Sequence, residues 1–277
     1  MGWWAVDVHG GTVHRDALAA WLVARTGQAV EQRDDGTLIT FAEDEASAEA
    51  LISGLATSPD PSATGARRAI QPVDWTTRWR EGLAARRLGR LVIRPSWIAP
   101  MLEPGEVEVV LDPEMAFGSG EHGSTRAALA MLVRLIRPGD RVLDLGSGSG
   151  ILSIAAVRLG AARATGIEID PEANHVARRN AVQNGVAAAC EFLDGEAGAL
   201  APLLGPSDLI LSNILRTANF ELLPAIRSAL RPGGLVIFSG MEAGEAPLFR
   251  PGLAAAGFAP ELEMTDDGWW AIAARRA

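Results

Sequence analysis

Residues 141–150 constrain the fold of this chain more than any other segment. They read Arg-Val-Leu-Asp-Leu-Gly-Ser-Gly-Ser-Gly, an apolar strand that runs into a turn with three glycines, and a helical pattern follows at 151–159. Glycine permits positive φ angles and lets the backbone approach a ligand closely. In an open α/β sheet, ligands bind beyond the carboxyl ends of the strands, where this turn lies. The segment therefore predicts an α/β fold with a small-molecule site at the turn.

The rest of the C-terminal half alternates strands with helices, which predicts a parallel sheet covered by helices on both faces. The expected parallel strands are 141–144, 164–169, 188–193, 208–213 and 235–239, and the expected helices between them are 151–159, 171–184 and 220–230. Residues 258–264 and 269–274 flank a Thr-Asp-Asp-Gly turn and form an expected antiparallel hairpin. We therefore predict a Rossmann-like sheet of seven strands, parallel with a C-terminal antiparallel hairpin, as in methyltransferase folds.

The N-terminal residues predict a separate small α+β domain at 1–64. Its expected elements are strands at 3–8 and 37–41 and helices at 15–25 and 43–55. Residues 58–65 are rich in proline, glycine and serine, which is typical of a linker. We assign 65–100 to a linker with a short helix at 74–82 and a strand at 88–94, and 101–277 to the catalytic domain.

Charge and composition exclude several classes of protein. The net charge of −9 disfavours direct binding to nucleic acid, which requires a basic surface. A single cysteine, Cys190, rules out an internal disulfide and a zinc site of several cysteines, and its apolar surroundings predict packing in a core strand. The sequence has neither an apolar run long enough to span a bilayer nor a secretory signal at its start. We expect a cytoplasmic monomer without a metal.

The glycine spacing distinguishes between nucleotide cofactors. A dinucleotide site reads Gly-x-Gly-x-x-Gly, whereas here Gly146, Gly148 and Gly150 alternate and Asp144 precedes them. A carboxylate would repel a pyrophosphate but attract the ammonium group of a methionine moiety. The turn therefore predicts S-adenosylmethionine as the cofactor.

Acidic residues follow the next two strands. Glu168 is placed to accept both ribose hydroxyls. Asp170 competes for that role, but it precedes Pro171 and is typical of a helix N-cap. Asp194 is placed to reach the adenine amino group, with an ordinary loop aspartate as the alternative.

Two further segments carry candidate catalytic groups. Asn213 ends an apolar strand and should face the crevice, because burial of an unpaired amide is unfavourable. Residues 117–125 read Phe-Gly-Ser-Gly-Glu-His-Gly-Ser-Thr, a loop that could fold over a cofactor. His122 is a candidate base or a structural residue, and Ser124 or Thr125 could cap the following helix.

Together these motifs resemble the PrmA family of class I methyltransferases, which act on large-subunit ribosomal protein L11. The resemblance rests on 117–125, 146–150, the Gly-Ile-Glu-Ile-Asp-Pro of 166–171 and the Asn-Ile-Leu of 213–215, and extends over about 70–277. It implies S-adenosylmethionine-dependent methylation of lysine and/or N-terminal amino groups, with S-adenosylhomocysteine as product and the N-terminal domain recognising the ribosomal protein. The family's cofactor contacts carry over to Thr125, Gly146, Glu168 and Asn213. To these we add Phe117, Gly118, Asp144, Gly148, Gly150 and Asp194 as expected cofactor-binding residues. This sequence departs from the family with Ser119, Ser124 and Glu168, where the family has Thr, Thr and Asp.

Within this interpretation, Asn213 and the loop around His122 are the candidate catalytic groups that orient a neutral amine. Three alternatives stay open: a methyltransferase acting on another protein or on a small-molecule amine, a nicotinamide oxidoreductase, and a non-catalytic binding module of the same fold.

Overall fold

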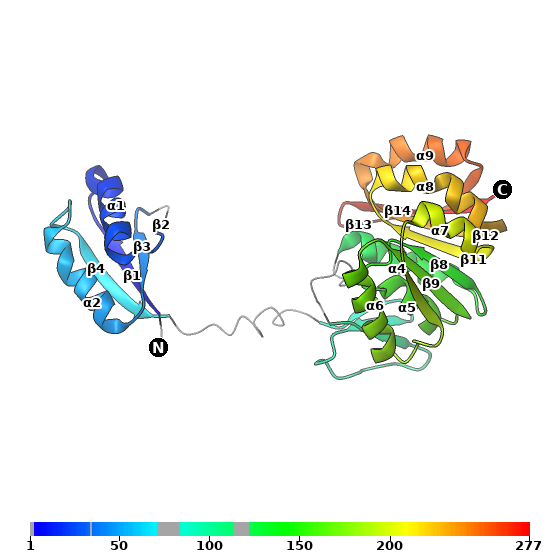
Figure 1. Ribbon diagram of the computed structural model, residues 1–277, viewed down its shortest axis with the longest axis horizontal. Coiled ribbons are helices and arrows are strands. Elements are labelled where there is room, and N and C mark those ends of the chain that lie inside the picture. The colour runs from blue at the N-terminus through cyan, green and yellow to red at the C-terminus, as the bar shows by residue number, and fades with distance from the viewer. Residues whose placement is uncertain (1–2, 34, 71–83, 113–121) are drawn as a thin grey trace. The chain divides into compact units, whose positions relative to one another are not determined.

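The structure is a computed structural model that describes residues 3–33, 35–70, 84–112 and 122–277. The chain divides into two compact units, Met1–Gly82 and Leu83–Ala277 (Figure 1). The first unit thus extends beyond the boundary at residue 64 that the sequence suggests. The short helix expected at 74–82 lies outside the described residues.

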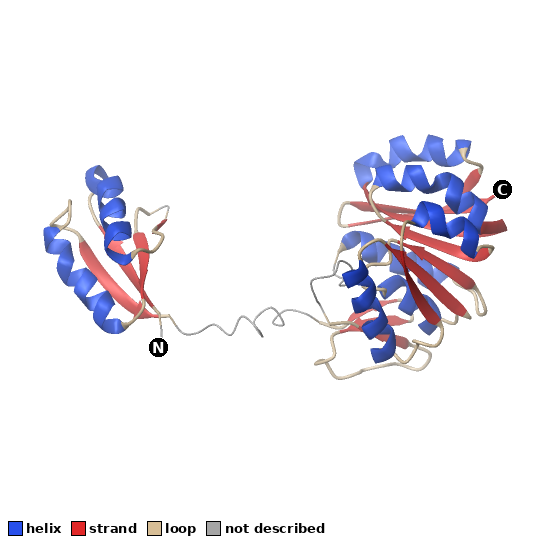
Figure 2. Cartoon of the chain, viewed as in Figure 1, coloured by secondary structure: helices blue, strands red, loops and turns tan. Residues whose placement is uncertain are grey.

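The N-terminal unit is the predicted α+β domain, and its described residues form an antiparallel sheet in the order β2-β3-β1-β4 with two α-helices (Figure 2). Its elements are β1 (Trp4–His9), α1 (Arg15–Thr26), β2 (Glu31–Gln32), β3 (Leu38–Ala42), α2 (Glu45–Gly54) and β4 (Thr64–Ala69). Val6 and Val8 of β1 pack against Leu18 and Leu22 of α1 in its core. Strand β4 begins at the predicted domain boundary, continues into the predicted linker and pairs with β1 over its whole length.

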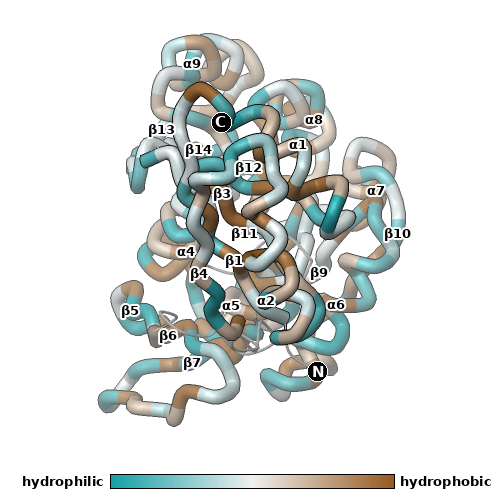
Figure 3. The backbone as a smooth tube through the Cα atoms, turned by 90° about the vertical axis from the view of Figure 1, so that its left-hand side faces the viewer, coloured by the Kyte–Doolittle hydropathy of each residue, from teal (hydrophilic) through white to brown (hydrophobic). Residues whose placement is uncertain are grey.

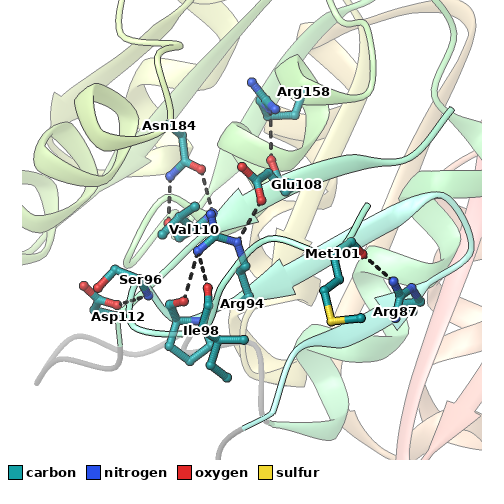
Figure 4. Close-up of polar contacts among 11 residues, drawn as sticks. Arg87, Arg94, Ser96, Ile98, Met101, Glu108, Val110, Asp112, Arg158 and Asn184 are labelled. Atoms are coloured by element: carbon teal, nitrogen blue, oxygen red, sulfur yellow. Dashed lines mark hydrogen bonds and ion pairs between the residues drawn. The ribbon is translucent and has the colours of Figure 1, made fainter. Parts of the chain in front are cut away.

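A three-stranded sheet opens the second unit. Strands β5 (Arg86–Leu88) and β6 (Leu91–Arg94) are antiparallel, and β7 (Val107–Val110) lies parallel to β6. The predicted strand at 88–94 is therefore divided by a turn. The Arg94 guanidinium donates to the Glu108 carboxylate at 2.8 Å and to the Ile98 carbonyl at 2.7 Å, which fixes the segment between β6 and β7 (Figure 4).

The main sheet has seven strands in the order β10-β9-β8-β11-β12-β14-β13. Every pairing from β10 to β12 is parallel, whereas β14 pairs antiparallel with β12 and β13, as the sequence predicts. The strands are β8 (Arg141–Leu145), β9 (Arg163–Glu168), β10 (Cys190–Asp194), β11 (Ser207–Asn213), β12 (Leu230–Glu242), β13 (Phe258–Asp266) and β14 (Trp269–Arg276).

Helices cover both faces of this sheet over two separate cores. The helices are α4 (Gly123–Leu135), α5 (Ile151–Arg158), α6 (Pro171–Gln183), α7 (Ala197–Leu204), α8 (Arg216–Ala229) and α9 (Ala246–Ala255). Side chains alternate along a strand, so Leu209 and Leu211 join the core under α4, α5 and α6, while Ile210 joins the core under α7, α8 and α9. The hydrophobic segments of the strands and helices are brown in Figure 3. Cys190 is buried in β10, as expected, and burial raises the pKa of its thiol to about 12.

The starts of two helices show which capping predictions hold. Asp170 caps α6, where its carboxylate accepts from the Glu172 N–H at 2.9 Å and Pro171 follows, as predicted. The capping prediction for α4 is wrong, because the N-cap is His122 and makes no side-chain capping bond. Ser124 and Thr125 lie buried in the first turn of α4 instead.

Candidate active site

A cavity of about 840 Å³ opens at the carboxyl ends of the parallel strands, near the junction of β8 and β11 where the strand order reverses. Ligands of open α/β sheets bind at this position. The lining residues are His122, Ser124, Gly146, Gly148, Ile167, Glu168, Ile169, Gly195, Glu196, Ala197, Gly198, Asn213, Ile214, Leu215, Ala218, Glu221, Leu222, Gly240 and Trp269. Apolar side chains and a few polar groups thus share the cavity wall.

Ile214 lies between two glycines of the cavity wall. A Cβ on Gly146, which has φ of +70°, would stand 2.5 Å from the Ile214 side chain. A Cβ on Gly240, with φ of +81°, would stand 2.3 Å from the Ile214 carbonyl oxygen. Both positions require glycine for conformation and for space, and together they let the 213–215 segment lie against the glycine turn.

Glu168 lines the cavity at the end of β9 and holds the glycine turn. One carboxylate oxygen accepts from the Gly148 N–H at 2.9 Å, and the other accepts from the N–H groups of Ile169 and Asp170. The Asp170 side chain caps α6 instead. Of these two acidic residues, Glu168 is therefore the one that lies at the cavity.

Asp144 lies beneath the glycine turn rather than on the cavity wall. Its Oδ2 accepts from the N–H and hydroxyl of Ser153 in α5, at 3.1 and 2.7 Å. Its Oδ1 is buried and has no hydrogen-bond partner among the described residues. Burial above all, and to a smaller extent the nearby Glu168 charge, raise the pKa of this carboxyl to about 7 against the opposing Ser153 hydrogen bonds.

Asp194 also lies outside the cavity lining, although the next residue, Gly195, is part of it. The Asp194 carboxylate accepts from the Asn174 amide at 2.7 Å and lies 3.5 Å from the Arg178 guanidinium. Its position at the end of β10 therefore depends on the side chains of α6.

Asn213 places an amide at the cavity end of β11. Its Nδ2 donates to the Thr125 hydroxyl at 3.2 Å, and its Oδ1 is buried without a partner among the described residues. Thr125 is fully buried in the first turn of α4. This amide oxygen is an acceptor that a ligand N–H could satisfy.

His122 and Trp269 lie side by side at the cavity, with ring centroids 4.3 Å apart. The His122 Nδ1 is 2.8 Å from the Ser124 hydroxyl. Two further contacts hold the β13–β14 turn against α4: Arg126 donates twice to the Asp266 carboxylate, and Gly123 leaves no space for a Cβ beside the Asp266 carbonyl. The Arg126 bonds also lower the pKa of Asp266.

Comparison with known proteins shows the family to which this chain belongs. Residues 9–277 match the model of the family described as ribosomal protein L11 methyltransferase (PrmA). The chain belongs to the PrmA family. A ribosomal protein L11 methyltransferase of Pelotomaculum thermopropionicum is 40% identical over 78% of this chain and 70% of its own length. One of Thermus thermophilus is 42% identical over 73% of this chain and 76% of its own length.

A solved structure also matches. The ribosomal protein L11 methylase of Lactobacillus delbrueckii subsp. bulgaricus superposes with a TM-score of 0.63 at 33% identity, over 70% of this chain and 99% of that chain. This PrmA family member is therefore an S-adenosylmethionine-dependent methyltransferase with the predicted fold.

The residues that line the cavity suit S-adenosylmethionine. Gly146 and Gly148 leave backbone exposed in the wall, and the Glu168 carboxylate stands beside them. Ile169, Leu215 and Leu222 provide apolar surface of the kind that flat aromatic rings bury. Among the described residues, no group of three or more His, Cys, Asp or Glu side chains could hold a metal ion.

The structure brings together His122, Gly146, Gly148, Glu168 and Asn213 of the predicted site residues. It places Thr125, Asp144, Gly150 and Asp194 next to this set, outside the cavity wall. Phe117 and Gly118 lie outside the described residues.

Sequence reasoning missed several cavity residues. Trp269 is the largest of them, and Glu196 and Glu221 are the charged ones. Trp269 comes directly after the hairpin turn of β13 and β14, but nothing in the sequence shows that this turn packs on α4. Glu196 is the N-cap residue of α7, and Glu221 lies inside α8. Charged residues are common at both kinds of position, so neither glutamate stands out in the sequence.

Proposed function

We propose that this methyltransferase modifies lysine and/or N-terminal amino groups of ribosomal protein L11 and leaves S-adenosylhomocysteine as product. The observation that carries the substrate is the family match, which extends over 9–277 and thus includes most of the N-terminal unit as well as the catalytic one. The curated relatives cited above carry the same name.

The predicted cofactor residues have separate tasks in this proposal. Bound S-adenosylmethionine supplies a methyl group on a positively charged sulfur. Gly146 and Gly148 offer room for a close approach of the cofactor to the backbone, while Glu168 accepts hydrogen bonds from the ribose hydroxyls. Asp144, Gly150, Thr125 and Asp194 support these residues from outside the cavity wall, and Phe117 and Gly118 complete the predicted set.

The target amine must be neutral and aligned before it can accept a methyl group. Deprotonation of a lysine of pKa ~10.4 at pH 7 costs roughly 4.6 kcal/mol, at about 1.36 kcal/mol per unit, and an α-amino group of pKa ~8 costs about 1.4. Apolar wall residues such as Ile214 and Trp269 disfavour the charged amine by desolvation, which lowers its pKa. A dedicated base is therefore unnecessary.

Asn213 and His122 orient the neutral amine in this mechanism. The Asn213 Oδ1, which has no partner among the described residues, accepts one amine N–H and so directs the nitrogen lone pair, while Thr125 holds the other end of the amide. His122, against Trp269, fixes the side of the cavity from which the amine enters. Alignment of this kind can contribute ~7–11 kcal/mol to methyl transfer.

The N-terminal unit recognises the protein substrate in this proposal. The KM for intact ribosomal protein L11 should then lie well below that for a short peptide containing the same lysines, at equal cofactor. Equal KM values would remove this role from the N-terminal unit and leave methyl transfer unaffected.

The experiment that tests the substrate is transfer of labelled methyl groups by the purified full chain. Recombinant ribosomal protein L11 is compared with other small basic ribosomal proteins and with a panel of small amines. We expect label in L11 alone. Preferred labelling of a small amine or of another protein would support the alternative substrates instead.

The proposal also includes a cytoplasmic monomer that requires no metal and contacts no nucleic acid directly. No helix among the described residues combines the length and the apolar character needed to cross a membrane. Light scattering on the purified chain measures the oligomeric state, and activity in the presence of a chelator tests the metal.

A further inference from the structure

Three asparagines lie on the buried side of helix α6, outside the cavity. Asn174, Asn180 and Asn184 are 0%, 5% and 8% exposed. A buried amide is unfavourable unless its groups are hydrogen-bonded. The partners of these three side chains therefore show what α6 holds in place.

Asn184, at the C-terminal end of α6, makes the pair of hydrogen bonds to strand β7 that the backbone of a neighbouring strand would make. Its Oδ1 accepts from the Val110 N–H at 2.7 Å, and its Nδ2 donates to the Val110 carbonyl at 2.8 Å (Figure 4). The Val107 and Leu111 N–H groups bond to the β6 side, so the backbone groups of Val110 point to the open edge of β7. On the same edge, Arg158 of α5 donates to the Glu108 carbonyl at 2.9 Å.

Asn180 lies one helical turn earlier and contacts the glycine turn. Its Nδ2 donates to the Ser149 carbonyl at 2.9 Å, between Gly148 and Gly150. The Asn180 carbonyl in turn accepts from the Asn184 Nδ2 at 2.8 Å. One continuous chain of hydrogen bonds thus joins Val110 to the turn that lines the cavity.

Asn174 repeats the arrangement at the other end of α6. Its Nδ2 donates to the Asp194 carboxylate at 2.7 Å and to the Leu193 carbonyl at 3.0 Å, and it lies 3.3 Å from the Glu168 carbonyl. The ends of β9 and β10 are therefore fixed by the same helix that fixes the glycine turn.

We propose that Asn180 and Asn184 are positioning residues for the cofactor: through the Ser149 carbonyl and the Val110 backbone, they hold the glycine turn at the distance from Glu168 that binding requires. Neither side chain lines the cavity. Their effect on the cofactor is indirect and should appear in its affinity, with turnover at saturating cofactor nearly unchanged.

The test is a calorimetric titration of the full chain with S-adenosylhomocysteine, which needs no protein substrate. Asn180→Asp keeps the size of the side chain but replaces the donor by a carboxylate that repels the Ser149 carbonyl. We expect the Kd to rise about 5- to 50-fold, because an unmade buried hydrogen bond has an effect of that order. With ribosomal protein L11 as the substrate, the KM for the cofactor should rise by a similar factor to the Kd. The kcat should stay within about twofold of wild type.

The matched control is Ile226→Val, a buried residue of α8 that does not line the cavity and belongs to the core on the other face of the sheet from α6. The Ile226→Val substitution should lower the Tm, whereas the Kd for S-adenosylhomocysteine should stay within about twofold of wild type. This comparison separates positioning from general loss of stability.

Asn184→Asp is the second variant and decides the question if Asn180→Asp does not fold. It keeps the acceptor for the Val110 N–H and loses the donor to the Val110 and Asn180 carbonyls, so we expect a Kd increase of about 3- to 10-fold. The proposal is overturned if the folded variants bind S-adenosylhomocysteine as wild type does, or if Ile226→Val weakens binding as much as they do.

Discussion

The amide of Asn213 donates to the hydroxyl of Thr125 at 3.2 Å, a bond that joins the end of β11 to the first turn of α4 across 88 positions of sequence. It leaves the Asn213 Oδ1 as an acceptor with no partner among the described residues. One side of the amide is thus fixed by the protein and the other is available to an amine.

Asn213→Ala should lower kcat about 100-fold at saturating cofactor, because loss of alignment of a reacting group has an effect of this size. Thr125→Val removes only the bond that orients the amide, and we expect a smaller loss of about 3- to 10-fold. Steady-state kinetics with the protein substrate measure both. Unchanged turnover in Asn213→Ala would remove the proposed role.

Gly146→Ala should weaken cofactor binding more than left-handed strain alone can explain. An added Cβ would meet the Ile214 side chain at 2.5 Å, whereas Gly139, with φ of +86°, has open space around it. Alanine in the left-handed region costs roughly 1–2 kcal/mol at either position. Gly139→Ala should therefore lose stability but keep its Kd for S-adenosylhomocysteine, and equal Kd values for the two variants would contradict the role of Gly146.

Glu168→Gln should raise the Kd for S-adenosylmethionine about 10- to 100-fold, because the charged acceptor proposed for the ribose hydroxyls is lost. Asp170→Asn is the control, since asparagine caps helices as well as aspartate does. Its Kd should match wild type. If Asp170→Asn weakened binding and Glu168→Gln did not, the assignment of the ribose contact would have to move to Asp170.

Asp144 should make stability depend on pH between about 4 and 7. Its pKa is raised by burial from 3.8 in the unfolded chain to about 7 in the folded protein, so the folded state binds the extra proton. The stabilisation is complete below the unfolded pKa and is lost as pH rises through the folded pKa. Asp144→Asn should flatten the decrease in the free energy of unfolding over this range, as measured by urea unfolding at several pH values. An identical pH dependence in the variant would show that Asp144 does not carry the effect.

The sequence predicts the parallel part of the large sheet well because its strands contain short apolar runs that are bounded by turn residues, such as residues 209–211 in β11. It does not predict β4, whose Thr-Gly-Ala-Arg-Arg-Ala has no apolar face and is exposed along most of its length. Helices α7 and α9 are also missed. Both contain an internal proline, Pro202 and Pro251, which normally ends a helix, although α8 is expected in spite of its Pro224.

The candidate site is predicted where a single segment carries the signal, as at Gly146, Gly148, Glu168 and Asn213. Trp269 and Ile214 contribute through packing between distant segments, which a pattern in one segment does not reveal. The asparagines of α6 look like ordinary polar helix residues in the sequence, and only their bonds to Ser149 and Val110 distinguish them.

The most direct test of the central claim is the intact mass of ribosomal protein L11 isolated from cells that lack this gene. We predict that the protein from these cells is lighter than that from wild-type cells by a whole number of methyl groups, and that the full chain restores the mass. An unchanged mass would contradict the proposed substrate.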